Sequence, residues 1–210
     1  MIEIIESIQQ GTPEWDLLRI GSIGGSSISA VAAKGRNGES KGRKQLLYDM
    51  AGEILSGVKK NGYTNKYMED GVELEDKART HYCLQNLCEV RQVALISDAP
   101  HKHCSPDGLI GEDGMIEIKC VIPSTFVAYC DGQSIPTDYR RQILWGLNRS
   151  GRAWCDFIVY CDLLEGRLKG DNILVTRVSR DEKEIRELEG EADIFIEELL
   201  SLVKRIGGVT

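Results

Sequence analysis

Asp107, Glu117 and Lys119 bring two carboxylates and an ammonium group into one short stretch of the chain. The segment Gly-Leu-Ile-Gly after Asp107 favours a short strand, and the Gly-Glu-Asp-Gly segment favours a tight turn because Asp-Gly tolerates the positive φ of hairpins. The alternation in residues 115–120 predicts a half-buried strand. Side chains two apart in a strand share a face, so Glu117 and Lys119 should point the same way. The hairpin should return Asp107 beside Glu117.

This arrangement suits hydrolysis of a phosphodiester. Two neighbouring carboxylates repel each other and need a cation between them, and hard oxygen ligands suit Mg²⁺ or Mn²⁺. Lys119 would lie beside a metal-bound water, where it can orient that water and stabilise charge on the phosphate. The alternative is that Glu117 and Lys119 form an ordinary solvated strand face and that Asp-Gly is simply a turn.

Glu75 is a candidate third carboxylate. It lies in a predicted helical segment that starts at residue 71 and whose apolar positions are Leu74, Ala78, Tyr82 and Leu87. An acid near the inward stripe of a helix needs a partner, and a metal ion is one. The alternative is a helix start at which acids are favoured by the helix dipole, and this explanation fits Glu73 and Asp76 better than Glu75.

The order of these motifs resembles that of the bacteriophage lambda exonuclease family, also called YqaJ-type viral recombinases, within the PD-(D/E)xK nuclease superfamily. The motifs are, in chain order, Glu14-Trp-Asp-Leu-Leu-Arg19-Ile-Gly-Ser-Ile-Gly-Gly-Ser26, Gly71-x3-Glu75-x2-Ala78-Arg79, Ser105-Pro-Asp-Gly108, Glu117-Ile-Lys119-Cys120 and Tyr139-Arg-Arg-Gln142-Ile-Leu-Trp145. The resemblance therefore spans residues 14–145, and the amphipathic carboxyl-terminal segment fits it as well.

The resemblance implies roles for the residues in these motifs. Glu75, Asp107 and Glu117 would bind metal together with the backbone carbonyl of Ile118. Lys119 would be the catalytic lysine, acting with Asp107 and Glu117. Gln142 would be a further catalytic residue that helps to hold the nucleophilic water or the lysine, although in its helix it can also be a neutral surface glutamine.

The resemblance also assigns Arg19, Ser26 and Ser105 to a pocket for the 5′-phosphate of a DNA end. A guanidinium fork and two hydroxyls suit an anion. Ser26 is expected to open a short helix over residues 26–33, whose free amides would help to bind the anion. The alternatives are a helix-end Arg19 in a surface ion pair and a Ser26 that is only an N-cap.

The fold class expected is α/β, a restriction-endonuclease-like PD-(D/E)xK core with a mixed central β-sheet flanked by helices. A chain of 210 residues suits a single nuclease domain over residues 1–210. Residues 34–42 should form a loop and residues 61–65 a turn. Strands are expected over residues 89–97, 156–162 and 172–178, and helices over residues 43–55, 67–87, 124–131, 137–148 and 181–206.

By resemblance, the activity expected is a Mg²⁺-dependent 5′→3′ exonuclease. It would degrade one strand of linear double-stranded DNA from a 5′-phosphorylated end, use two Mg²⁺ ions (or Mn²⁺), and leave 3′ single-stranded tails for phage-type recombination. The expected partners are a single-strand annealing protein and further copies of the chain in a trimeric ring. The alternatives are a structure-specific or restriction-type endonuclease and a non-catalytic DNA-binding relative.

The formal net charge of −7 is awkward for a DNA-binding protein. Local basic clusters could still bind phosphates; they contain Lys34, Arg36, Lys41, Arg43, Lys44, Lys59, Lys60, Arg140 and Arg141. No apolar run approaches the roughly 18 residues of a membrane span. Because the first residues are acidic, we expect no signal peptide and a cytoplasmic location in a bacterial host.

The 7 cysteines do not predict a disulfide framework, since their number is odd and the expected compartment is reducing. Their spacing does not favour an iron–sulfur cluster. Cys120 is expected to pack in the core. His101 and His103 lack a convincing set of further zinc ligands and are interpreted as exposed loop histidines.

Overall fold

The computed structural model describes residues 1–35, 38–60 and 66–207, with the backbone alone for residues 38–39 and 66–72. The predicted turn at residues 61–65 and Arg36 of the first basic cluster lie outside the described residues. No helix in the described part of the chain is long and apolar enough to cross a membrane.

The central sheet contains 4 strands in the order β6-β7-β8-β9. They are β6 (Gly108–Ile110), β7 (Gly114–Cys120), β8 (Trp154–Tyr160) and β9 (Ile173–Ser179). The pairs β6–β7 and β8–β9 are antiparallel, whereas β7–β8 is parallel. A parallel pair needs a long crossover, which α5 (Pro123–Cys130) and α6 (Thr137–Ser150) supply. The expected mixed α/β fold is confirmed.

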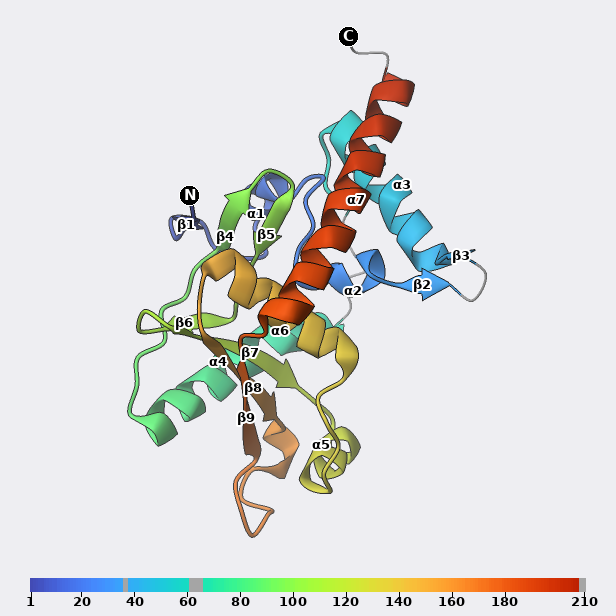
Figure 1. Ribbon diagram of the computed structural model, residues 1–210. Helices are drawn as coiled ribbons and strands as arrows, with labels where there is room; N and C mark the ends of the chain where they lie inside the picture. The colour runs from blue at the N-terminus through green and yellow to red at the C-terminus, as the bar shows by residue number, and fades with distance from the viewer. Residues whose placement is uncertain (36–37, 61–65, 208–210) are drawn as a thin grey trace.

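Helices cover both faces of this sheet (Figure 1). On one face, α4 (Lys66–Asn86) packs Ala78 and Tyr82 against Ile116 and Ile118 of β7. On the other face lie α6 and α7 (Glu182–Gly207), and Met115 of β7 belongs to the larger core on that side. Strand β7 is thus buried on both faces for most of its length, and the prediction of a half-buried strand is wrong. Its alternation arises because a charged site, rather than solvent, occupies part of one face.

A second sheet of 3 antiparallel strands has the order β1-β4-β5. Its strands are β1 (Glu3–Ile5), β4 (Leu95–Ala99) and β5 (Lys102–Cys104). The predicted strand over residues 89–97 is wrong for residues 89–94, where Arg91 makes only an isolated bridge to Leu109. The shorter strands β1 and β5 escaped prediction because three residues carry too little periodicity.

The amino-terminal part holds α1 (Pro13–Leu18), α2 (Ile28–Val31) and α3 (Lys41–Ser56). The predicted loop over residues 34–42 is wrong, because β2 (Lys34–Gly35) pairs with β3 (Gly38–Glu39) and α3 begins at Lys41. A short 3₁₀ helix, η1 (Asp162–Leu164), follows β8. Leu87, predicted on the inward stripe of α4, is 93% exposed with φ 49°, because the helix has already ended at Asn86.

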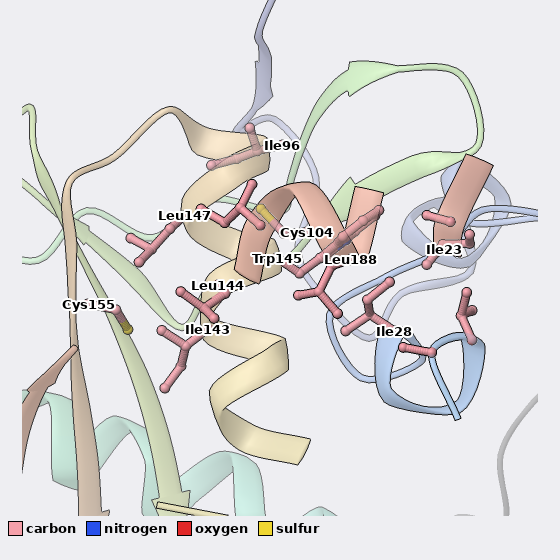
Figure 2. Packing of buried hydrophobic residues seen from close by; sticks show 14 of the residues in the cluster. Ile23, Ile28, Ile96, Cys104, Ile143, Leu144, Trp145, Leu147, Cys155 and Leu188 are labelled. Atoms are coloured by element: carbon pink, nitrogen blue, oxygen red, sulfur yellow. The ribbon is translucent and has the colours of Figure 1, made fainter. Parts of the chain in front are cut away.

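Helix α6 runs through the middle of the larger core (Figure 2). Ile143 and Leu144 lie toward Cys155 of the central sheet, while Trp145 faces Leu188 of α7 and Ile28 of α2. The Trp145 indole N–H donates to the carbonyl of His103 across 2.8 Å, which fixes β5 to this helix. The helix that carries Gln142 is therefore anchored on both sides.

The predicted apolar stripe of α7 is packed against the protein's own core. Its buried residues are Ile185, Leu188, Ala192, Phe195, Leu199 and Leu202, with Val203 half-buried beside them. Helix α3 lies along the carboxyl-terminal half of α7 (Figure 1). Intramolecular packing therefore accounts for this stripe.

Candidate active site

The β6–β7 hairpin brings Asp107, Glu117 and Lys119 together as the spacing predicts. Gly108, the first residue of β6, pairs with Ile116. Asp107 immediately precedes β6 and therefore lies opposite Glu117 of β7. Its Oδ2 accepts the backbone N–H of Ile118 at 2.6 Å. Lys119 Nζ donates to Glu117 Oε1 at 2.6 Å, so both side chains lie on one face of the strand.

Gln142 of α6 reaches the same carboxylate. Its Nε2 donates to Glu117 Oε1 across 2.6 Å, the oxygen that also accepts from Lys119. Gln142 is therefore a partner of Glu117 rather than a neutral surface residue. Glu117 is 3% exposed, so these two donors offset only part of the cost of burying its charge.

Glu75 arrives from α4 on the other side of Asp107. Its Oε1 accepts from Arg79 Nη2 at 2.6 Å, and Arg79 Nε donates to the carbonyl of Asp107 at 3.0 Å. Asp76 also receives a bond from Arg79. Arg79 is 8% exposed and links the helix to the segment that precedes β6.

Electrostatics couple the three carboxylates to one another. Burial first, and then the charge of Asp107, raise the pKa of both Glu75 and Glu117 above the usual range. Burial likewise raises the pKa of Asp107. Burial disfavours the ammonium of Lys119, but the Glu117 carboxylate outweighs it, so the pKa of Lys119 is raised. A positive charge among these acids would relieve their repulsion.

A divalent cation fits the chemistry of this donor set, since clustered carboxylate oxygens are ligands that hard cations prefer. The side chains are turned elsewhere, however: Glu75 to Arg79, Asp107 to Ile118 and Glu117 to Lys119. Across the described ranges, no three His, Cys, Asp or Glu side chains form a ready-made metal site. Binding a metal here requires these carboxylates to exchange partners.

A small pocket of about 140 Å³ joins residues that are far apart in the sequence. Its lining includes Arg19, Ser26 and Ser105, the predicted anion-binding trio, together with Glu117 and Gln142. The Ser105 hydroxyl is buried and finds no hydrogen-bond partner within the described part of the chain. A buried hydroxyl without a partner is costly, and a ligand oxygen would satisfy it.

Arg19 is set in place by an aromatic ring. Its guanidinium carbon lies 3.7 Å from the centroid of Trp15, and its Nε donates to His103 Nε2 at 3.3 Å. The ion pair expected for a helix-end arginine also exists, to Asp16 at 3.7 Å. The side chain is 20% exposed, so Arg19 belongs to the pocket wall rather than to an open surface.

Ser26 is exposed and lines the pocket, but it does not begin a helix. Helix α2 starts at Ile28 after Ser27, so the predicted helix over residues 26–33 is too long and Ser26 is not its N-cap. The amides of Ser27 and Ile28 already donate to the carbonyl of Gly24. The expected contribution of free helix amides is therefore wrong.

Two glycines let the chain approach the site closely. A Cβ on Gly24 would lie 2.6 Å from His103 Nε2, and one on Gly25 would lie 3.1 Å from Gln142 Cγ. The Gly-Gly pair thus packs between β5 and α6, and larger residues would push the two walls of the pocket apart.

Glu75 and Asp107 line a neighbouring hollow of about 640 Å³. Gln10, Trp15 and Pro106 border both hollows and form the wall between them. Gln10 Nε2 donates to the carbonyls of Val93 and Pro106, at 2.8 and 3.2 Å, and so braces this wall. The carboxylates are therefore distributed over two adjoining hollows.

The two histidines were predicted to be exposed in a loop. This prediction is wrong for His103, which lies in β5 and is 3% exposed. His101 does lie in a turn, with φ 61°, but it is half-buried. Sequence reasoning also missed Gln10 and Trp15 as pocket residues. For His103 a signal was available, because His103, Ser105 and Asp107 alternate, and alternate residues of an extended chain share a face.

Much of the predicted basic surface is neutralised by acids of the same chain. Arg43 is 8% exposed and bound to Glu198, while Arg140 is bound to Glu184. Other pairs are Lys59 with Glu53, Lys60 with Asp49 and Lys34 with Glu191. These clusters therefore present less net positive charge to a phosphate backbone than the sequence suggests.

Comparisons with known proteins agree with this architecture. The sequence model of the YqaJ-like viral recombinase domain matches residues 14–153. The alkaline exonuclease LHK-Exo from Laribacter hongkongensis is 30% identical, with a TM-score of 0.82 over 93% of this chain and 96% of that one. The same protein in complex with dAMP gives a TM-score of 0.84 over the same shares, again at 30% identity.

A phage-related exonuclease from Haemophilus somnus 129PT is 14% identical, with a TM-score of 0.70 over 91% of this chain and 99% of that one, and shares the fold. No curated protein matches the chain. The family match covers most of the chain and contains all the motifs around the two hollows. The protein belongs to the YqaJ-like viral recombinase family and has the fold of the alkaline exonucleases.

Proposed function

We propose that this nuclease is a Mg²⁺-dependent 5′→3′ exonuclease that degrades one strand of linear duplex DNA from a 5′-phosphorylated end. The observation that carries the proposal is the pocket in which Arg19, Ser26 and Ser105 adjoin Glu117 and Gln142. An anion site beside a nuclease carboxylate would hold the terminal phosphate of a strand at a fixed distance from the bond that is cut. An enzyme with such a site would act at strand ends and release mononucleotides.

The proposed metal ligands are Glu75, Asp107, Glu117 and the backbone carbonyl of Ile118. These groups would bind two Mg²⁺ ions, which Mn²⁺ could replace. When bound, the ions supply Lewis-acid catalysis and a nucleophile at neutral pH. The raised pKa values of the three carboxylates support this assignment, since mutual repulsion favours a bound cation.

Lys119 and Gln142 are the proposed catalytic partners. Both donate to Glu117 Oε1, so a cation that draws on Glu117 would leave their N–H groups available near the scissile phosphate. The ammonium of Lys119 would then stabilise charge that develops on the phosphate. Gln142 would orient the attacking water or the lysine. Arg19 and the serine hydroxyls hold the 5′-phosphate through charge-assisted bonds.

The family and the exonucleases that the chain resembles support a proposal for the biological setting. We propose that residues 1–210 form a single nuclease domain and that three copies form a ring around the DNA. The product would be a 3′ single-stranded tail taken up by a single-strand annealing protein for phage-type recombination. A ring that encloses its substrate would make digestion processive.

The test uses two substrates with Mg²⁺ present. One is a linear duplex with a 5′-phosphate on only one strand, and the other is a covalently closed circle. Selective loss of the phosphorylated strand with an untouched circle supports the proposal. Nicking of the circle would instead make the protein an endonuclease, and equal digestion of both strands would refute the phosphate pocket.

Arg19→Ala sharpens this test, since it should reduce the preference for the phosphorylated strand while DNA with 5′-hydroxyl ends is still cut. Arg205→Ala is the matched control, because that arginine is exposed near the end of α7 and lines neither hollow. It should keep the wild-type preference.

A further inference from the structure

His103 is a buried residue in the wall of the proposed anion pocket. It lies in β5, where its backbone N–H donates to Ile23 and its carbonyl accepts from Trp145. Its imidazole touches Arg19 through Nε2 and Ser22 through Nδ1, at 3.3 and 2.8 Å. Both ring nitrogens are therefore engaged, and the ring leans toward the pocket without reaching the carboxylates.

The partners determine the tautomer. Arg19 Nε can only donate, so Nε2 of His103 must carry a lone pair. The proton then sits on Nδ1 and is donated to Ser22 Oγ. Burial, followed by the positive charges of Arg19 and Lys59, lowers the pKa of His103 to about 3, so the imidazole is neutral under ordinary conditions.

Lys59 is the second charged group near the ring, and it also binds Arg19. Lys59 Nζ donates to the carbonyl of Arg19 at 3.2 Å and to Glu53 Oε2 at 2.8 Å. Trp15 covers the guanidinium of Arg19 at 3.7 Å. With one face covered and Nε taken by His103, Arg19 can offer an incoming anion its Nη groups, of which Nη1 also lies 3.7 Å from Asp16 Oδ1.

We propose that His103 is a positioning residue: its neutral imidazole, held by Ser22, accepts the Nε–H of Arg19 and so points the Nη groups of Arg19 at a 5′-phosphate. This inference rests on the proposed function. It assigns His103 no contact with the reacting atoms. It explains why an imidazole is buried here, since a protonated ring would repel Arg19 and lose its acceptor.

The test compares three variants on duplexes that differ only in a 5′-phosphate or a 5′-hydroxyl. His103→Phe keeps an aromatic ring but removes both nitrogens. It should lower the phosphate preference in kcat/KM about tenfold or more, because a misdirected Arg19 guanidinium loses its effect over short displacements. The rate on 5′-hydroxyl ends should stay at the wild-type value. His103→Gln, whose amide oxygen can accept from Arg19, should rescue most of the preference.

His101→Asn is the control, from the turn between β4 and β5. The imidazole of His101 contacts the Gly21 carbonyl at 2.8 Å, and asparagine tolerates the positive φ of this position. It should keep the wild-type preference. Nitrogen NMR of wild type should show His103 protonated at Nδ1 alone. Protonation at Nε2, or a wild-type phosphate preference in His103→Phe, would overturn the role of His103 but leave the proposed phosphate pocket standing. A wild type without any phosphate preference would overturn the proposed pocket and the inference with it.

Discussion

Gln142 donates from Nε2 to Oε1 of Glu117 across 2.6 Å, although the two residues are 25 positions apart. The bond joins α6 to the central strand β7 at the one oxygen that Lys119 also contacts. A helix that is otherwise apolar toward the sheet thus holds a buried carboxylate in place. The relationship makes Gln142 the most direct link between the core packing of α6 and the proposed chemistry.

The first prediction concerns this bond. Gln142→Ala should lower kcat about 10- to 100-fold, because partners that orient a ligand typically contribute that much. KM for DNA should change little. Gln45→Ala is the control, since that glutamine is exposed on α3 and its side chain bonds to Asp49 on the same helix. A wild-type kcat in Gln142→Ala would remove the residue from the proposed catalytic set.

Asp107 should be needed for cleavage but not for DNA binding. Asp107→Asn keeps an acceptor for the Ile118 N–H yet loses the charge that a metal requires. Mg²⁺-dependent cleavage should fall by about a thousandfold, since the lost Lewis-acid assistance is worth several kcal/mol. Binding to duplex DNA in Ca²⁺ should survive.

The control for Asp107 is Asp113→Asn at the exposed tip of the same hairpin, which should cleave DNA at the wild-type rate. Full activity of Asp107→Asn would disprove the proposed ligand set. Loss of DNA binding in Ca²⁺ together with cleavage would point instead to a damaged hairpin.

Arg79 should matter for stability as well as for the site. Arg79→Met leaves the half-buried Glu75 without its partner and removes the bond to the Asp107 carbonyl. Breaking such a pair should lower the free energy of unfolding by about 3 kcal/mol, as measured by urea denaturation.

Lys77→Met is the matched control on the same helix. Lys77 is 48% exposed, and its pairs with Glu73 and Asp162 span 3.8 and 3.4 Å. Exposed pairs contribute little, so unfolding should change by less than about 0.5 kcal/mol. Equal effects of the two substitutions would contradict the structural role of Arg79.

Acid should destabilise the protein partly through His103. Burial lowers the folded-state pKa of His103 to about 3, whereas an unfolded histidine titrates near about 6.5. Between these values the unfolded chain binds a proton that the folded chain does not. Stability should therefore be complete above about pH 6.5 and fall as the pH drops toward 3.

The measurement is the melting temperature of wild type and His103→Phe as a function of pH. Below pH 6.5 the variant should lose less stability per pH unit than wild type, while above pH 7.5 both should have the same slope. Parallel curves throughout would show that His103 does not carry this acid sensitivity.

The local chemistry of the site can be predicted from short stretches of sequence. A spacing of two in β7 was enough to place Glu117 and Lys119 on one face, and the Asp-Gly turn was enough to fold Asp107 back toward them. These are short-range relationships, set by the period of a strand and by the φ that a turn requires. The stripe of α7 was equally readable, because a period of 3.6 repeated over many residues outweighs local exceptions.

The residues that lie across from each motif depend on how distant segments pack. No local pattern shows that Gln142 meets Glu117, that Arg79 joins Glu75 to the Asp107 carbonyl, or that His103 is buried behind Arg19. These contacts depend on how α4, α6 and β5 pack around the sheet. The burial of both faces of β7 has the same origin, since a strand's pattern does not reveal how many helices cover it. Long-range packing fixed these relationships because a pairing between distant segments costs chain entropy that only the assembled core can offset.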